Sequence, residues 1–395
     1  MDGTTTNYTY TYDPMGRLLT ASRDGSIVEQ YQYSSNGTRT YEENTLRGIT
    51  GWNLVYSEED HLLTAGSTSY QYNTDGFLTS KTQGGNSTSY QYSSRGELLS
   101  VSLPDGRAIE YLHDPLARRI GKKVNGNITE KYLWQGRTRL LAVYDGNDNL
   151  LMRFNYADGR MPVSMVKDGS TYYLMYDQVG SLKAVTDSSG NVVKNIDYDS
   201  FGNIITDTNS SFTIPFGFAG GLYDQDTGLV RFGYRDYFPE VGRWTAKDPI
   251  LFRGGDTDLF AYLINDPINY FDKYGLDSTS WRGDGRSIWD GPKNGNWGGK
   301  NWSGGWNPSL HGGQNGPLLP TDSGDICYMN HDNCYTRAGD CGKAERSCDL
   351  ELVNCLNKLP SNSKEWPSPP KLGTEGDSET FRDWATNHFT NKWVE

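Results

Sequence analysis

The sequence has 395 residues, more than one ordinary domain holds, and its 37 basic and 49 acidic side chains give a net charge of −12. Phosphate binding needs a basic surface, so this charge argues against a nucleic-acid partner. No apolar run approaches the roughly 20 residues of a membrane span. The polar start MDGTTTNYTY is unlike a secretory signal, so neither a signal peptide nor a transmembrane segment is expected. The unusual feature is the large number of Tyr (27) and Gly (46).

A tyrosine followed four residues later by glycine recurs along the first half of the chain. It occurs at Tyr12, Tyr33, Tyr72, Tyr92, Tyr176 and Tyr198, and weaker copies begin at Tyr56 and Tyr111. Alternating aromatic and polar residues come before each turn of Asp, Asn, Ser and Gly, and a short apolar stretch follows it. This pattern predicts a β-hairpin with glycine in the left-handed conformation. A single hairpin is unstable alone, so successive copies are expected to pair in one continuous sheet.

The repeated unit resembles the RHS or YD repeat, and residues 219–276 closely resemble the RHS-associated core domain that ends such arrays. The resemblance implies a mainly β repeat shell over residues 1–218, a core domain over 219–276 and a C-terminal toxin over 277–395. Composition changes at this boundary, because all five Cys and eight of the eleven Trp follow Leu276. By the same resemblance we expect synthesis in a bacterial cytoplasm, a secretion or delivery apparatus as partner, and a cognate immunity protein.

The resemblance also implies self-cleavage after Leu276. The family's terminal Asp-Pro-x-Gly-Leu motif corresponds to the segment that starts at Asp272, in which Lys273 replaces the proline. Asp248 matches a second family aspartate, and Arg243 precedes it. Two close carboxylates can share one proton, so one acts as base toward water and the other as acid toward the leaving amide. The alternative is that both aspartates are turn residues that cap the last strands.

Four of the five cysteines form two pairs with the same spacing of seven residues, Cys327 with Cys334 and Cys348 with Cys355. Residues 326–337 and 344–358 are each predicted to be helical, and seven residues make about two turns, so each pair lies on one face. Helices joined by a short loop pack antiparallel. This favours the disulfides Cys327–Cys355 and Cys334–Cys348 and an oxidising place of action. Zinc is the alternative, although the close cysteine pairs typical of zinc sites are absent.

His331 lies between the two cysteines of the first predicted helix, and Asp349 directly follows a cysteine of the second. Both side chains can therefore project between the helices. A histidine oriented by a buried aspartate is a general-base pair, because the carboxylate fixes the tautomer and the other ring nitrogen takes a proton from water. Asp332 supplies a hard oxygen ligand beside this base, and carbonyl groups of a glycine-rich loop can complete a calcium site.

This constellation resembles secreted phospholipase A2, whose C-x-x-x-H-D-x-C-Y signature matches residues 327–335. The resemblance implies hydrolysis of the sn-2 ester of membrane phospholipids. By the resemblance His331 activates water, Asp349 orients the histidine, and Tyr335 supports the aspartate through a hydrogen bond. The family's pairing of the equivalent cysteines is the same antiparallel pairing.

The calcium loop of that family is expected here at residues 311–316, HGGQNG, with Gly312 and Gly313 as carbonyl donors beside Asp332. Bound Ca²⁺ polarises an ester carbonyl and stabilises the developing oxyanion. Tyr328 stands where the family has a further cysteine. The five tryptophans between residues 281 and 306 either insert at a lipid interface or pack the small domain against the shell.

The sequence therefore predicts a toxin that attacks membranes of a competitor or host, with a β-rich repeat shell, a self-cleaving junction and a small, disulfide-linked, helical phospholipase A2-like domain. The alternative is a noncatalytic surface protein whose repeats mediate adhesion or bind carbohydrate and whose Cys-rich tail is a stapled cap. Residues 360–370 are predicted to be a linker.

Overall fold

The computed structural model describes residues 6–157, 159–251, 258–276, 279–280, 323–338 and 342–369, together with residues 382 and 386. The chain separates into two compact units. The first consists of Met1–Asp13 and Arg17–Trp281, and the second of Pro14–Gly16 and Arg282–Glu395.

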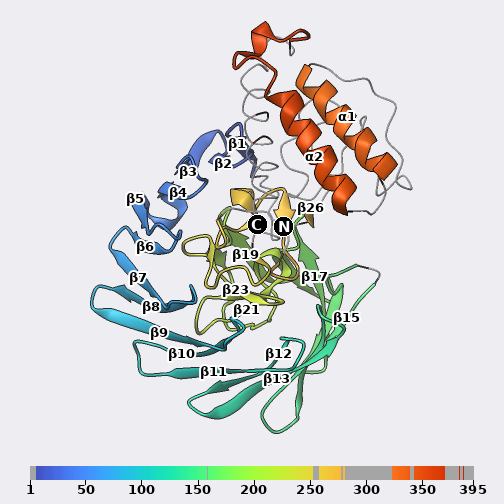
Figure 1. Ribbon diagram of the computed structural model, residues 1–395. Helices are drawn as coiled ribbons and strands as arrows, with labels where there is room; N and C mark the ends of the chain where they lie inside the picture. The colour runs from blue at the N-terminus through green and yellow to red at the C-terminus, as the bar shows by residue number, and fades with distance from the viewer. Residues whose placement is uncertain are drawn as a thin grey trace. The chain divides into compact units, whose positions relative to one another are not determined.

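Within the described residues, twenty strands of the first unit form one antiparallel sheet, in which each strand pairs with the next along the chain (Figure 1). The strands are β1 Tyr8–Tyr12, β2 Leu18–Arg23, β3 Ser26–Tyr33, β4 Arg39–Asn44, β5 Ile49–Tyr56, β6 Leu62–Ala65, β7 Thr68–Tyr72, β8 Leu78–Gln83, β9 Asn86–Tyr92, β10 Leu98–Ser102, β11 Ala108–His113, β12 Arg119–Val124, β13 Asn127–Gln135, β14 Arg139–Tyr144, β15 Leu150–Asn155, β16 Ser164–Lys167, β17 Ser170–Tyr176, β18 Leu182–Asp187, β19 Val192–Tyr198 and β20 Ile204–Asp207. The predicted continuous sheet of hairpins is confirmed.

The repeated tyrosine ends a strand and pairs with the residue six positions later, after a register shift of the ladder. This holds at Tyr12, Tyr33, Tyr56, Tyr72, Tyr92, Tyr144, Tyr176 and Tyr198. The glycine four residues on adopts a positive φ, for example +79° at Gly76 and +83° at Gly96, as the hairpin pattern predicts. A β-bulge of this kind bends its strand and increases the local twist, so each repeat contributes to the curvature of the sheet in Figure 1.

One detail of the repeats differs from the sequence interpretation. The copy expected at Tyr111 is displaced, because His113 takes the position before the turn and Tyr111 is the buried residue two places earlier. The position after the turn carries an aliphatic core: Leu18, Leu62, Leu78, Leu98 and Leu182 are each 0–1% exposed. Tyrosines such as Tyr70 and Tyr90 pack within this core.

A four-stranded antiparallel sheet lies inside the curve of the large sheet (Figure 1). Its strands are β21 Leu222–Tyr223, β22 Val230–Phe232, β23 Arg235–Phe238 and β24 Arg243–Trp244. The ring of Tyr237 lies 4.2 Å from that of Tyr262 and 5.7 Å from that of Trp244. The 3₁₀ turns Phe218–Gly220 and Leu263–Asn265 flank this sheet, and β25 Tyr270–Phe271 pairs with β26 Thr279–Ser280.

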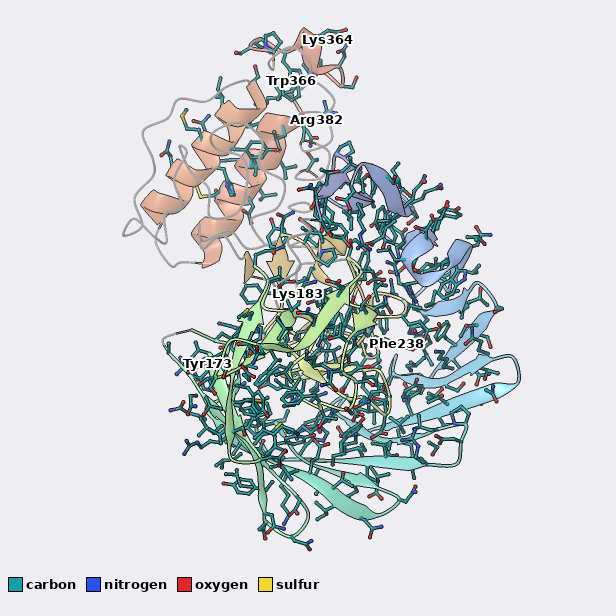
Figure 2. The ribbon with its side chains drawn as sticks, turned by 180° about the vertical axis from the view of Figure 1, so that it is seen from behind. Tyr173, Lys183, Phe238, Lys364, Trp366 and Arg382 are labelled. Carbon is teal, nitrogen blue, oxygen red and sulfur yellow. A yellow bond between two sulfur atoms is a disulfide. The ribbon has the colours of Figure 1, made fainter. Side chains whose placement is uncertain are left out.

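Side chains fill the space between the small sheet and the concave face of the large one. Figure 2 shows exposed Tyr173 at the outside of β17 and Phe238 of β23 within the curve. Phe238 packs edge-on against Tyr70 at 6.4 Å between ring centroids. Backbone contacts add to this packing, because the amide of Leu78 donates to the carbonyl of Thr245 at 2.9 Å. The residues of the expected core domain thus supply the interior of the curved sheet.

Early and late strands of the large sheet meet in what we name the closing contact, formed by Glu29, Asn44 and Arg47 with Asp199 and Ser200. The backbone amide of Ser200 donates to the Glu29 carboxylate at 3.2 Å, and the Asn44 side chain donates to Asp199 at 3.0 Å. Burial and the negative charge of Asp199 raise the pKa of Glu29 to about 7. Burial raises the pKa of Asp199 to about 6, opposed by Arg47. Both carboxyl groups of the contact therefore have pKa values raised toward neutral pH by their burial.

The described part of the second unit contains two helices, α1 Ser323–Ala338 and α2 Gly342–Leu356, and the 3₁₀ turn Ser363–Glu365. The predicted helices are confirmed, with slightly different ends. The prediction of a linker at residues 360–370 is wrong for residues 360–369, which the structure describes. Trp366, labelled in Figure 2, is 3% exposed there, and its indole nitrogen donates to the Pro360 carbonyl at 2.7 Å. Neither described helix is long and apolar enough to cross a bilayer.

Candidate functional site

Two disulfide bonds join α1 and α2 at both ends of the pair. Cys327 bonds Cys355 and Cys334 bonds Cys348, as the antiparallel arrangement predicts. Each bond connects Cα atoms 5.7 Å apart. Cys327, Tyr328, Leu352 and Leu356 form a small buried cluster beside these bonds. The bonds fix the relative position and register of two helices that have a modest apolar core.

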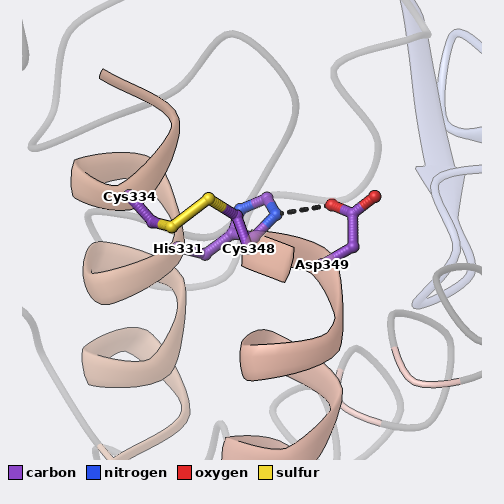
Figure 3. The surroundings of a disulfide bond; sticks show 4 residues. All are labelled: His331, Cys334, Cys348 and Asp349. Carbon is purple, nitrogen blue, oxygen red and sulfur yellow. Dashed lines mark hydrogen bonds and ion pairs between the residues drawn. A yellow bond between two sulfur atoms is a disulfide. The ribbon is translucent and has the colours of Figure 1, made fainter. Parts of the chain in front are cut away.

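His331 of α1 and Asp349 of α2 meet beside the Cys334–Cys348 bond (Figure 3). The His331 Nε2 lies 2.9 Å from the Asp349 Oδ1. Asp349 is fully buried, and the His331 side chain is 12% exposed. An ionised carboxylate only accepts hydrogen bonds, so in the neutral imidazole this contact corresponds to the tautomer with the proton on Nε2 and the lone pair on Nδ1. The pair has the geometry of a histidine base oriented by a buried carboxylate.

The remaining residues of the predicted hydrolase site are not placed. Asp332 and Tyr335 belong to α1, but their side chains lie outside the described part of the structure, as do residues 311–316 with Gly312 and Gly313. The described residues contain no cluster of three or more His, Cys, Asp or Glu side chains that could hold a metal. The calcium site therefore stays a prediction.

At the predicted junction, Asp248 and Asp272 lie against one arginine, Arg235 of β23. The Arg235 Nη2 is 2.8 Å from Asp248 Oδ2 and 3.7 Å from Asp272 Oδ2. The Arg235 Nε donates to the Gly275 carbonyl at 2.6 Å. Asp248 is 5% exposed and Asp272 is 2% exposed. The structure thus brings two buried carboxylates and the Gly275 carbonyl, one residue before Leu276, around a single guanidinium.

Asp272 also determines the conformation of the segment that follows it. Its Oδ1 accepts hydrogen bonds from the amides of Tyr274 at 3.0 Å and Gly275 at 2.7 Å. Gly275 has φ +67°, and a Cβ there would lie 2.4 Å from the Phe232 carbonyl oxygen, so only glycine fits. The glycine of the expected motif therefore allows the backbone at residue 275 to pass close to the backbone at Phe232.

Arg243 does not join this cluster. Its guanidinium makes a bidentate pair with Asp258, at 2.6 and 2.8 Å, and also donates to the Asp60 carbonyl at 2.8 Å. Sequence order points to Arg243, which precedes Asp248, but the arginine at the two aspartates is Arg235. It lies in a strand whose four residues, Arg235–Phe238, are all buried in the structure. Buried charges are usually paired, and here the partners of the guanidinium are carboxylates.

Comparison with known proteins gives the family of the first unit. Residues 1–268 match the Teneurin YD-shell family. The chain belongs to this family. This result confirms the YD-repeat shell, whereas the phospholipase A2 resemblance stays a prediction.

Curated relatives of this YD shell include animal and bacterial proteins. The chain is 30% identical to Teneurin-1 of Gallus gallus over 294 residues, 71% of this chain and 11% of that protein. It is 26% identical to the tRNA3(Ser)-specific nuclease WapA of Bacillus spizizenii over 283 residues, 69% of this chain and 11% of that protein. The chain thus spans about a tenth of the length of these relatives.

Among solved structures, the crystal structure of TcdB2-TccC3-Cdc42 is similar, with a TM-score of 0.46 and 18% identity. This similarity covers 70% of the present chain and 16% of the other.

Proposed function

We propose that the C-terminal unit is a phospholipase A2-type esterase carried by the YD shell. The observation that supports this proposal is the 2.9 Å contact between His331 and buried Asp349 within a helix pair held by two disulfides. Asp349 keeps the proton on Nε2, so Nδ1 accepts a proton from water as that water attacks the ester carbonyl. The imidazolium then returns the proton to the leaving alcohol, which gives a fatty acid and a lysophospholipid.

Calcium is part of the proposal as a cofactor to be tested. Asp332 and backbone carbonyls are hard oxygen donors of the kind that Ca²⁺ prefers. No step assigned to His331 or Asp349 depends on the ion. Membrane phospholipids as substrate, a delivery apparatus and a cognate immunity protein belong to the same proposal.

The test is release of fatty acid from mixed phospholipid vesicles by the full chain with intact disulfides and Ca²⁺. His331→Ala and Asp349→Asn are expected to lower the rate about 10²- to 10⁴-fold, the usual contribution of a general base. Glu351→Gln is the matched control, because Glu351 is an exposed acid on the same helix. Absence of activity in the native chain, or full activity in the His331 variant, would contradict the proposal and favour the adhesion alternative.

The similarity to WapA does not by itself assign the nuclease activity in that protein's name to the C-terminal unit. The similarity extends over 283 residues, more than the whole segment after Leu276 contains, so it includes a large part of the shell. Incubation of the full chain with tRNA tests for nuclease activity directly. Cleavage of tRNA that depends on His331 would replace the esterase proposal with a nuclease.

We also propose that the shell cleaves itself after Leu276. In this proposal Asp248 and Asp272 provide a base for water and an acid for the leaving amide nitrogen, and it is supported by the contacts of Arg235 with both carboxylates and with the Gly275 carbonyl. Lys273 in place of the family proline leaves these contacts intact.

The mass of the denatured protein tests self-cleavage. Fragments of residues 1–276 and 277–395 are expected from the native sequence, and one intact chain from Asp248→Asn. Asp105→Asn is a control at an exposed aspartate. A native chain that stays intact under all folding conditions, or an Asp248→Asn chain that is still cut, would reject the proposal.

A further inference from the structure

A small hollow on the first unit lies between β12–β14 of the large sheet and β22 of the small one. Four arginines line it: Arg118, Arg119 and Arg137 from the large sheet and Arg231 from the small sheet. It offers about 40 Å³ to the centres of water-sized spheres. This is room for a few waters or one small anion, and too little for an organic ligand of ordinary size.

The four arginines of the hollow have few directly bonded carboxylate partners. Asp236 serves two of the arginines, accepting from Arg119 at 2.8 Å and from Arg231 at 2.7 Å. Arg118 pairs with Asp114 at 2.6 Å, and Arg137 donates to the hydroxyl of Tyr234. Among the described residues that line the hollow there is no acidic side chain. The guanidinium groups thus have direct ion pairs with two carboxylates, Asp236 and Asp114, while the charges of Asp224 and Glu97 act on Arg119 and Arg231 from farther away.

Two of these arginines are buried with hydrogen-bonding capacity left over. Arg119 and Arg231 are each 3% exposed. In the described part of the chain, the Nε of each has no hydrogen-bond partner. A buried donor without a partner is costly, and two such donors on arginines that line one hollow favour an acceptor ligand there.

The positive charges also act on a neighbouring histidine. Burial, followed by the charges of Arg231 and Arg119, lowers the pKa of His113 to about 3. Burial and the charge of Arg119 also lower the pKa of Arg231, against the opposing effect of Asp236, whereas the carboxylates of Asp236 and Asp224 raise the pKa of Arg119 against its burial. A negative group in the hollow relieves both interactions.

We propose that this hollow binds a phosphate group, free or as the end of a phosphomonoester. A phosphate has several strong acceptor oxygens at the scale of the hollow, and guanidinium groups bind it in bidentate fashion. Because Arg118, Arg119 and Arg137 come from one sheet and Arg231 from the other, the bound group links the small sheet to the large one. Phosphate is therefore a stabilising ligand of the shell, independent of any activity of the C-terminal unit.

The experiment is thermal unfolding and calorimetric titration of the full chain with inorganic phosphate, against chloride at equal ionic strength and pH. Phosphate is expected to raise the unfolding temperature and to bind with one site per chain. Arg137→Gln removes an exposed arginine of the hollow and is expected to weaken binding about ten- to hundredfold, the value of one charge-assisted hydrogen bond.

A second variant tests the hollow without changing its charge. Thr138→Trp places a large ring into the hollow from the half-buried turn between β13 and β14 and is expected to abolish binding. Arg153→Gln, at an exposed arginine of β15 that does not line the hollow, should bind as the native chain does. O-phosphoserine that binds more tightly than inorganic phosphate identifies a phosphomonoester, and weaker binding identifies the free anion.

Two results would overturn the inference. One is equal stabilisation by phosphate and chloride. The other is phosphate binding that Arg137→Gln and Thr138→Trp leave unchanged, because the site would then lie elsewhere.

Discussion

Replacing Asp236 with asparagine is expected to destabilise the shell strongly. The side chain is 1% exposed and forms charged hydrogen bonds with Arg119 and Arg231, which are themselves 3% exposed. Asparagine keeps the shape and can still accept one bond, but it removes the negative charge that the two buried guanidinium groups share. Breaking a buried ion pair by removing one partner costs about 3–5 kcal/mol.

This loss is a large part of the ~5–15 kcal/mol by which a domain is ordinarily stable. Urea unfolding followed by intrinsic fluorescence, with the slope compared between variants, measures it. Asp105→Asn is the control, because Asp105 pairs with Arg107 at the surface and its loss should leave the midpoint unchanged. If Asp236→Asn unfolded at the same urea concentration as Asp105→Asn, the reasoning about uncompensated buried charge would be refuted.

Three further predictions concern the closing contact, the helix pair and the turns. Because the pKa of Glu29 is raised in the folded state, its contribution to stability is complete below the ordinary pKa of 4.5 and is lost as the pH rises through about 7. Urea unfolding should therefore show that the free energy of unfolding of the native protein falls by more than about 1 kcal/mol relative to that of Glu29→Gln as the pH rises from 5 to 8. Parallel pH profiles of the two proteins would speak against this reasoning. Replacing Cys334 and Cys348 by serine opens a loop of 14 residues and should lower the stability of the helical unit by about 3 kcal/mol. The measurement is thermal unfolding of the helices followed by circular dichroism. A melting curve that neither the substitution nor a reductant changes would contradict this prediction. Gly202→Ala should lower the unfolding temperature more than Gly190→Ala does. A Cβ at Gly202 would lie 2.3 Å from the Phe218 ring, whereas a Cβ at Gly190 would meet no atom within 4 Å. Both glycines have a positive φ, which costs an alanine about 1 kcal/mol at either position, so equal effects would exclude the steric argument.

Local features of the fold were predictable from the sequence. The hairpin turns follow from Tyr-x-x-x-Gly, since backbone conformation at the glycine is decided within a few residues. The helix pair and its cross-links follow from cysteine spacing, because helical geometry converts a separation of seven residues into one face. The pairing of His331 with Asp349 follows from the same geometry.

Contacts between distant parts of the chain were not predictable in this way. Arg235 reaches Asp248 and Asp272 through the packing of the small sheet, and Arg243, nearer in sequence, is held by Asp258 instead. Glu29 and Ser200 meet only because the large sheet curves. Trp366 gave a signal that the linker interpretation overlooked, since a large indole in a short segment tends to be buried.

The register shift at each repeated tyrosine has a consequence for how such a protein can change its size. Curvature resides in the individual repeat, so whole repeats can be duplicated or lost and the ladder continues unbroken. The closing contact has no such freedom. Glu29 and Asn44 near the start of the sheet bond to Asp199 and Ser200 near its end, and these groups meet only when the number of strands between them is right. Tandem duplication in the gene would therefore extend the sheet easily, and the compatibility of its two ends would decide which lengths survive.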